Sequence, residues 1–287
     1  MFILILLKCL LIEEVQRLQS CVLLNFKILA HYRTYLHIGG TCWPENTLSA
    51  IQIGYKYGYK AVEFDVMLSK DNIPFLMHDD ILGRTVRNTE YTGYSFSDIL
   101  STDIIQIDAG SWFGATNPDL TTVRIPKFED VIQYCIVQDI YMNIEIKPVP
   151  GYEKLTGEIV AELTMKYFPI DYNTHKLPLF SSFSYDALLA AQRVAPHIPR
   201  AYLIDNIHNV PDWKQRLYTL QAVALHTNHK QITKQLIDEL KFPIQINDPT
   251  FLVFCYTVNS TEDADRLLDM GVDAFCTDKL DLFRSYI

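Results

Sequence analysis

The second half of the chain alternates short apolar runs with longer segments whose apolar residues recur every three to four positions. Short runs of this kind are typical of buried strands, and the longer segments are typical of amphipathic helices. Strict alternation of the two favours a parallel sheet covered by helices. The expected strands are 142–146, 177–183, 201–204, 222–226, 252–258 and 274–277, and the expected helices are 128–138, 152–167, 185–194, 213–220, 230–240 and 261–270.

Two earlier apolar runs, residues 26–30 and 61–68, complete this pattern. Together with the later runs they make eight strands, the number that closes a (β/α)8 barrel, the TIM barrel. A doubly wound open sheet is the alternative, but no Gly-x-Gly-x-x-Gly turn follows the first expected strand. We therefore expect an α/β protein with a TIM barrel fold.

The run 61–68 is followed, after a short turn, by a second apolar run at 73–77. The connection is too short for a parallel crossover, so the two runs are expected to fold back as a hairpin. Period-two alternation places Glu63 and Asp65 on one face of the first arm, and His78 follows the second arm. Two buried carboxylates repel each other unless a positive charge lies between them. The alternative is a solvated strand face with both acids in water.

The remaining stretches set the domain organisation. Residues 1–25 form an apolar extension that begins with MFILILLKCLLI, a run too short to cross a bilayer, and we expect a packing helix there. Residues 26–287 are expected to form one barrel domain. Within it, a helix should follow Asn46 or Thr47 as its N-cap. Residues 82–126 are irregular and polar, which indicates a functional segment or a small inserted subdomain.

Composition narrows the classes of partner. The chain has 287 residues, 49% of them apolar, which is ample material for a large core. Its formal net charge of −9 and the absence of any basic run argue against a nucleic-acid partner. The six cysteines form no Cys-x-x-Cys pair, so we expect reduced thiols in a cytoplasmic protein, without a disulfide framework or a zinc site.

Candidate chemistry gathers where the barrel strands end, since the carboxyl ends of the strands carry the active site in this fold. Glu63, Asp65 and Glu145 would form an oxygen-rich pocket for Mg²⁺ or Ca²⁺. Lys147 shares a strand face with Glu145, either as an ordinary ion pair or as a group that holds a phosphate oxygen. His78 is a candidate general acid or base, because imidazole titrates near neutrality, and a structural role is the alternative.

Further polar side chains follow the later strands. His226 and His229 flank Asn228 at a strand end, which predicts either a substrate-recognition edge or a solvated loop. Ser181 and Ser182 lack a Gly-x-Ser-x-Gly elbow, so a serine nucleophile is disfavoured. Four aromatic residues either wall a pocket or belong to the core: Trp43, Trp112, Phe113 and Phe183.

An ordered set of short motifs runs through residues 26–280. The motifs are His37-x-Gly39-Gly40, Pro44-Glu45-Asn46-Thr47, Glu63-Phe64-Asp65, His78-Asp79-Asp80, Leu82-x-Arg84-Thr85, DAGSWF at 108–113, Asn143-Ile144-Glu145-Ile146-Lys147-Pro148, Ser181-Ser182-Phe183, His226-x-Asn228-His229-Lys230, Tyr256-Thr257-Val258-Asn259, and Gly271-Val272-Asp273 with Cys276-Thr277-Asp278. In this order the set resembles the glycerophosphodiester phosphodiesterase family, and most closely its bacterial cytosolic members. Each motif alone is weak, but the ordered set is highly specific.

The resemblance implies a TIM barrel with a small insertion, about residues 84–124, that caps the active site. It also implies metal-dependent hydrolysis of glycerophosphodiesters to sn-glycerol 3-phosphate and an alcohol, in glycerophospholipid breakdown. Matched by position, the metal ligands for Mg²⁺ or Ca²⁺ are Glu63, Asp65 and Glu145. The acid/base pair is His37 and His78. The substrate-binding residues are Lys147, Phe183, Asn228 and His229.

The chain departs from the family pattern in its first motif. Ile38 stands where the family motif His-Arg-Gly has its arginine, which removes a bidentate phosphate contact. The stretch 27–31 also looks like the family's first strand and histidine, so His31 is the alternative to His37. We favour His37 because Gly39 and Gly40 follow it, as in the family motif. One alternative function is a catalytically impaired barrel that binds glycerophospho-compounds. Another is a related phospholipid-cleaving phosphodiesterase that contacts membranes through residues 1–20.

Overall fold

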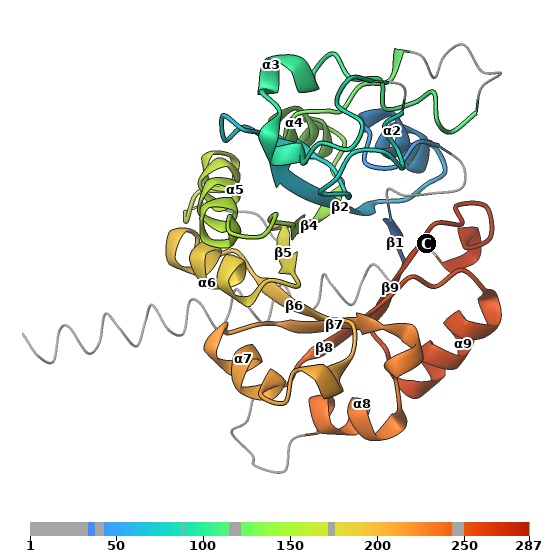
Figure 1. The fold of residues 1–287 in the computed structure, drawn as a ribbon. Helices are drawn as coiled ribbons and strands as arrows, with labels where there is room; N and C mark the ends of the chain where they lie inside the picture. Colours follow the sequence, from blue (N-terminus) through green and yellow to red (C-terminus); the bar gives the residue numbers. More distant parts are fainter. Residues whose placement is uncertain are drawn as a thin grey trace, which may run out of the picture.

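Eight parallel strands close into a barrel in the computed structural model, which describes residues 34–37, 43–87, 89–114, 122–171, 176–242 and 250–286 (Figure 1). Neighbours follow the order β1-β9-β8-β7-β6-β5-β4-β2, and a β1–β2 pairing closes the ring. The strands are β1 Thr34–His37, β2 Ala61–Leu68, β4 Tyr141–Ile146, β5 Leu179–Ser182, β6 Arg200–Ile204, β7 Ala224–Asn228, β8 Leu252–Tyr256 and β9 Ala274–Thr277. The α/β class and the TIM barrel are confirmed.

Helices surround the outside of this barrel (Figure 1). They are α2 Leu48–Lys56, α4 Phe128–Val137, α5 Glu153–Tyr167, α6 Tyr185–Val194, α7 Trp213–Thr219, α8 Lys234–Lys241 and α9 Thr261–Met270. Several begin at a side chain that caps the first turn: Thr47 accepts from the N–H of Ala50, and Ser260 from that of Asp263. Across the described part of the chain, no helix combines the length and apolarity that a membrane span needs.

The first strand and the start of α8 differ most from the sequence prediction, and the bounds of β5, β7 and β8 differ from it by one or two residues. The place between β2 and β9 is filled by β1, with Leu36 opposite Val62, so the first strand was predicted too early in the chain. The predicted strand 26–30 and the apolar extension 1–25 lie outside the described residues. Helix α8 begins at Lys234 instead of residue 230, because the Thr233 hydroxyl accepts from Leu236 N and caps the helix there.

The predicted hairpin is confirmed. Strand β3, Pro74–Leu76, pairs antiparallel with β2, and Leu76 lies opposite Val66. Beyond the last pair, the N–H of Met77 donates to the carbonyl of Asp65 at 3.1 Å. The hairpin therefore carries His78, the next residue, back along β2 to the neighbourhood of Asp65.

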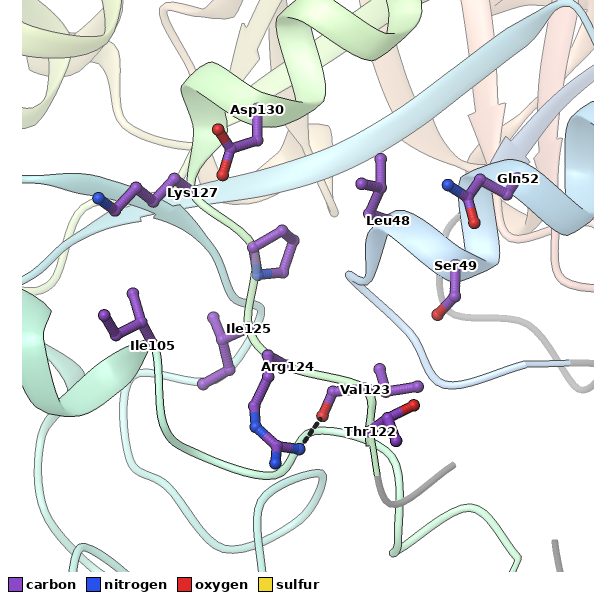
Figure 2. Close-up of a pocket in the computed structure, with 11 residues that line it drawn as sticks. Leu48, Ser49, Gln52, Ile105, Thr122, Val123, Arg124, Ile125, Lys127 and Asp130 are labelled. Carbon is purple, nitrogen blue, oxygen red and sulfur yellow. Dashed lines mark hydrogen bonds between the residues drawn. The ribbon is translucent and has the colours of Figure 1, made fainter. Parts of the chain in front are cut away.

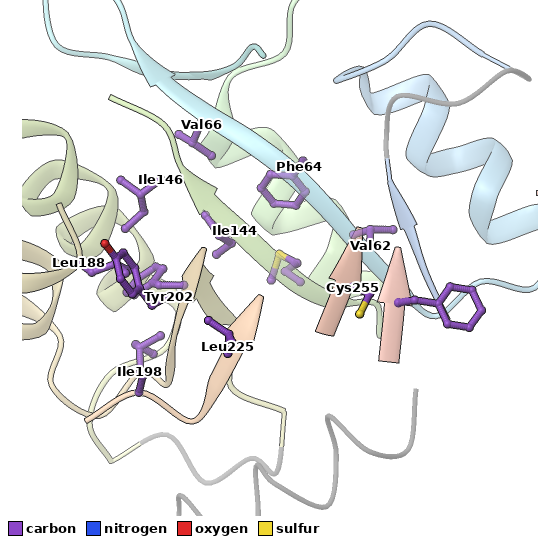
Figure 3. Close-up of a cluster of buried hydrophobic side chains, with 14 of the residues drawn as sticks. Val62, Phe64, Val66, Ile144, Ile146, Leu188, Ile198, Tyr202, Leu225 and Cys255 are labelled. Atoms are coloured by element: carbon purple, nitrogen blue, oxygen red, sulfur yellow. The ribbon is translucent and has the colours of Figure 1, made fainter. Parts of the chain in front are cut away.

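Alternation along each strand separates two cores. The side chains of Val62, Phe64 and Val66 point outward from β2 and pack with those of the neighbouring strands beneath the helices (Figure 3). Fully burying one such side chain stabilises the fold by about 1.5–3 kcal/mol. Inward-facing residues at the amino-terminal ends of the strands fill the barrel itself, and they include Tyr35 and Tyr141. Polar side chains take the inward positions further along β2, β4, β5 and β7.

The stretch between β3 and α4 packs around an apolar cluster of its own, to which Phe96 and Ile104 belong. It carries a short 3₁₀ helix, η1 Phe96–Asp98, and a short helix, α3 Ser101–Ile104. Asp71, in the hairpin turn, accepts from the backbone N–H of Ser101 at 2.8 Å and from its hydroxyl at 2.6 Å. Residues 84–124, predicted as an insertion, fall within this stretch, and their capping role stays a prediction.

Candidate active site

Three carboxylates meet inside the barrel at the carboxyl ends of β2 and β4. Glu63 and Asp65 come from β2, and Glu145 comes from β4, where it lies in register with Asp65. All three are less than a tenth exposed, and each offers an oxygen within 4.8 Å of those offered by the other two. Such a group of buried anions is strongly self-repulsive unless positive charge balances it.

These carboxylates line a cavity of about 190 Å³ in the barrel. The other lining residues are His78, Asn143, Lys147, Ser181, Phe183, Leu203, His226, Phe254, Tyr256, Thr257 and Cys276. Phe183 is 46% exposed and stands edge to face with Tyr256, their ring centroids 5.9 Å apart. A cavity at the carboxyl ends of the strands, with a few convergent polar groups and an aromatic wall, has the form of a TIM-barrel active site.

Larger hollows lie elsewhere on the molecule. One of about 490 Å³ lies between α2 and the segment 122–127 that leads into α4 (Figure 2). Arg124 donates there to the carbonyl of its neighbour Val123 at 3.1 Å. Among the described residues that line this hollow there is no histidine and a single carboxylate, Asp130. Volume alone therefore does not locate the chemistry, and the smaller cavity has the better set of groups.

Lys147 supplies positive charge to the carboxylates. Its Nζ lies 3.0 Å from Oδ1 of Asp65 and 4.0 Å from Oε1 of Glu145. Burial by itself lowers the pKa of Lys147, but the attraction of Asp65 and Glu145 outweighs burial and raises this pKa above its usual value. The ammonium is therefore held in its charged form beside the carboxylates, and the charge of three acids exceeds what this one ammonium balances.

Asn46 orients Asp65, a role that the sequence prediction missed. Its Nδ2 donates to Oδ2 of Asp65 at 2.8 Å, and its Oδ1 accepts from the Asp65 N–H at 3.1 Å. Asn46 is 5% exposed and has a backbone φ of 51°, a left-handed conformation that asparagine tolerates. Thr47 alone caps α2. The sequence did offer a signal for this role: Asn46 and Thr47 are both typical helix-capping residues, but a helix needs only one cap, so the other was available for another function.

His78 is held by a network of charged side chains. Its Nδ1 lies 2.6 Å from Oδ1 of Asp79, and Arg84 donates through Nε to Oδ2 of Asp79 at 2.8 Å. Arg84 also binds both carboxylate oxygens of Glu45. Burial raises the pKa of Asp79, but the hydrogen bonds from Arg84 and His78 outweigh it and lower that pKa. Glu45, His78 and Asp79 are close enough to hold a cation, but the Arg84 guanidinium already binds the carboxylate oxygens of both acids.

The histidine of the first motif lies on β1. The backbone of His37, the last residue of β1, is in register with Glu63 on the neighbouring strand. Parallel strands bring their carboxyl ends to one edge of a barrel, so this position is compatible with the predicted pairing of His37 and His78. His31, its alternative, and Ile38 lie outside the described residues.

The predicted substrate-binding residues divide into two groups. Lys147 and Phe183 line the cavity. Asn228 does not appear in its described lining; it donates to Asp205 at 3.1 Å and accepts from the Lys230 N–H at 3.0 Å, which caps η4, His229–Gln231. His229 is also outside this lining, and its Nδ1 lies 3.9 Å from Asp263. The structure therefore brings Phe183 to the carboxylates but not Asn228 or His229.

Several lining residues were not predicted as site residues. Asn143 lies two positions before Glu145 and therefore faces inward as Glu145 does. The period of two along a strand could have predicted this position from the sequence. Ser181 and His226 were considered, but neither was assigned to the cavity. Of the four aromatic residues considered for its wall, Phe183 lines the cavity, whereas Phe113 packs against the cluster of the β3–α4 stretch.

The buried carboxylates fit a hard divalent cation. Carboxylate oxygens are the ligands that Mg²⁺ and Ca²⁺ prefer, and no thiolate or imidazole belongs to the described group of three. Asn46 and Lys147 hold one ligand, Asp65, in place from two sides, as outer partners of metal ligands commonly do.

Comparison with known proteins agrees with this geometry. The model of the glycerophosphoryl diester phosphodiesterase family matches residues 39–282. A glycerophosphodiester phosphodiesterase of Caldanaerobacter subterraneus is 28% identical over 239 residues, 82% of this chain and 88% of the relative. A phosphodiesterase structure from Oleispira antarctica, in complex with the product sn-glycerol-3-phosphate, has 31% identity and a TM-score of 0.74, covering 86% of this chain and 92% of that one. The glycerophosphodiester phosphodiesterase structure from Thermotoga maritima, at 21% identity and a TM-score of 0.63, covers 88% and 97% and shares the fold.

Proposed function

The chain belongs to the glycerophosphoryl diester phosphodiesterase family, and on that premise we propose that it hydrolyses glycerophosphodiesters to sn-glycerol 3-phosphate and an alcohol with a divalent cation, Mg²⁺ or Ca²⁺. The observation that carries the proposal is the group of buried carboxylates, Glu63, Asp65 and Glu145, with Lys147 beside them and His78 in the same cavity. Buried anions of this density suit a cation that receives a phosphodiester.

The protein's own groups have separate roles in this proposal. Glu63, Asp65 and Glu145 would hold the cation, which would supply charge neutralisation for the phosphate when bound. Lys147 donates to a phosphate oxygen. His78, with Nδ1 engaged by Asp79, presents Nε2 to the leaving oxygen and gives it a proton as the P–O bond breaks. His37 takes the proton of the attacking water. The same two histidines exchange protons with solvent before the next turnover.

The test is release of glycerol 3-phosphate from glycerophosphocholine, first with Mg²⁺ or Ca²⁺ and then with a chelator. Glu63→Gln, which keeps the shape but removes the charge, should abolish metal-dependent release. The matched control is Glu162→Gln on the exposed face of α5, which should leave it unchanged. Turnover that survives chelation, or that survives Glu63→Gln, would show that the carboxylates are not the metal site.

If the folded protein binds Mg²⁺ but releases no glycerol 3-phosphate, the second candidate function is favoured, a barrel that binds glycerophospho-compounds without turnover. The sequence feature behind it is Ile38, in place of the family arginine. We also propose a cytoplasmic role in glycerophospholipid breakdown. Its support is that Cys135, Cys255 and Cys276, the cysteines among the described residues, are free and buried, as in a reducing compartment.

A further inference from the structure

The inner face of the barrel carries polar side chains that the proposed chemistry leaves unused. Asn143 on β4, Ser181 on β5 and His226 on β7 are each at most 1% exposed, and all three line the cavity. Asn143 lies two residues before Glu145, and Ser181 lies in register with Glu145. These side chains therefore line the part of the barrel that also holds the carboxylates.

Each of these side chains has at least one buried polar atom without a hydrogen-bond partner in the described part of the chain. Oδ1 of Asn143, Oγ of Ser181 and both ring nitrogens of His226 have no hydrogen-bond partner there. Proteins rarely bury such atoms unpaired, because an unsatisfied buried donor or acceptor destabilises the fold. Three of these side chains in one cavity indicate that ligand groups or ordered water complete their hydrogen bonds.

His226 is suited to hydrogen bonding with an alcohol hydroxyl. Its ring stacks on Phe254 with centroids 4.4 Å apart and an interplanar angle of 26°, which fixes the plane of the imidazole. Burial lowers the pKa of His226 to about 3, so the ring is neutral at neutral pH. A neutral imidazole offers one donor and one acceptor, which matches an alcohol hydroxyl and adds no charge for a phosphate.

We infer that Asn143, Ser181 and His226 form a hydroxyl-binding floor that receives the glycerol moiety of the substrate, with His226 as a specificity-determining residue. The inference rests on the proposed function and predicts the orientation of the substrate in the cavity. Glycerol enters the barrel, the phosphate stays beside the carboxylates and Lys147, and the leaving alcohol faces the exposed Phe183. Room is sufficient, since a cavity of about 150 Å³ accepts benzene, and this one has about 190 Å³.

The test compares two ligands by calorimetry in the presence of Mg²⁺: glycerol 3-phosphate, and propyl phosphate, which lacks both hydroxyls. The full-length wild-type chain should bind glycerol 3-phosphate at least tenfold more tightly. His226→Leu should weaken glycerol 3-phosphate about tenfold and leave propyl phosphate within about twofold, whereas His226→Gln, which still donates and accepts, should restore much of the preference. The matched control is His208→Leu, an exposed histidine that is not among the described lining residues of this cavity, and it should leave the preference unchanged.

Three results would overturn the inference. Equal losses for both ligands in His226→Leu would show a packing role. A wild-type chain without preference would show that the floor holds ordered water only. If His226→Leu does not fold, the same comparison is made with Ser181→Ala. An unchanged preference of that variant for glycerol 3-phosphate over propyl phosphate overturns the inference. Failure of the proposed function looks different: glycerophosphocholine is not cleaved, yet the preference for glycerol 3-phosphate remains.

Discussion

Replacing Asn46 with glycine should weaken the metal site in a barrel that still folds. The side chain makes two hydrogen bonds to Asp65, one of 2.8 Å to the carboxylate and one of 3.1 Å from the backbone. A hydrogen bond to a charged group contributes about 1.5–3 kcal/mol, and a neutral one about 0.5–1.5 kcal/mol. Glycine loses both, but it adopts the φ of 51° without strain. We expect Mg²⁺ affinity to fall about 10–100-fold, the usual effect of losing an outer partner of a metal ligand.

The assay measures Mg²⁺ affinity by calorimetry and the Mg²⁺ dependence of glycerophosphocholine hydrolysis. Asn46→Gly should need more Mg²⁺ for half-maximal activity while reaching a similar rate at saturation. Asn72→Gly is the matched control, because Asn72 also has a positive φ, 62°, but lies exposed in the hairpin turn. Asn46→Ala adds backbone strain of about 1–2 kcal/mol, so its urea midpoint should fall below that of Asn46→Gly.

An Asn46→Gly protein with wild-type Mg²⁺ affinity would refute this reasoning, since the remaining partners of Asp65, Lys147 among them, would then suffice to hold it. An equal loss in Asn72→Gly would refute it as well, because the effect would come from the asparagine-to-glycine change in any left-handed turn. Both outcomes are measurable on folded protein, since neither glycine substitution strains its backbone.

The other predictions concern His78, the hairpin turn and Arg200 at the start of β6. Asp79→Asn should lower kcat about 10²–10⁴-fold, with a smaller effect on KM, because His78 loses the carboxylate that fixes its tautomer. Hydrogen bonds from Ser101 lower the pKa of Asp71 to about 2, so their stabilisation is present above about pH 4 and is lost as the pH falls through 2. Ser101→Ala should therefore reduce the difference in unfolding free energy between pH 7 and pH 2. Arg200→Met, which leaves three carbonyls without their buried guanidinium donor, should cost about 3 kcal/mol or more in urea unfolding.

The carboxylate group could be predicted from the sequence because local rules determine it. Period-two alternation put Glu63 and Asp65 on one face, and pairing of neighbouring parallel strands brought Glu145 alongside. The first strand could not be predicted in the same way. Residues 26–30 are more apolar than the four residues of β1, but a barrel strand is selected by its pairing with β2 and β9. Burial between two neighbours is a tertiary property that local apolarity does not encode.

Contacts between distant segments explain the other omissions. Asn46 precedes Asp65 by 19 residues and reaches it from the loop before α2, so no strand or helix period connects them. His226 and Asn228 are two residues apart, and either was a candidate for a recognition edge. Only the course of β7 and η4 shows that His226 lines the cavity while Asn228 caps a turn.

The base of the barrel is filled by aromatic rings, since Tyr35 stands edge-on to Tyr141 at 5.9 Å and to Phe254 at 5.0 Å. In the described part of the barrel these rings close the cavity from below, so a ligand enters and leaves the chamber at the carboxyl ends of the strands. If the glycerol end is seated deepest, as inferred from the hydroxyl-binding floor, the alcohol departs first and glycerol 3-phosphate departs last. Glycerol 3-phosphate would then occupy the space that the next substrate needs, and we expect it to slow turnover by direct competition with substrate, whereas the released alcohol should leave the chamber accessible.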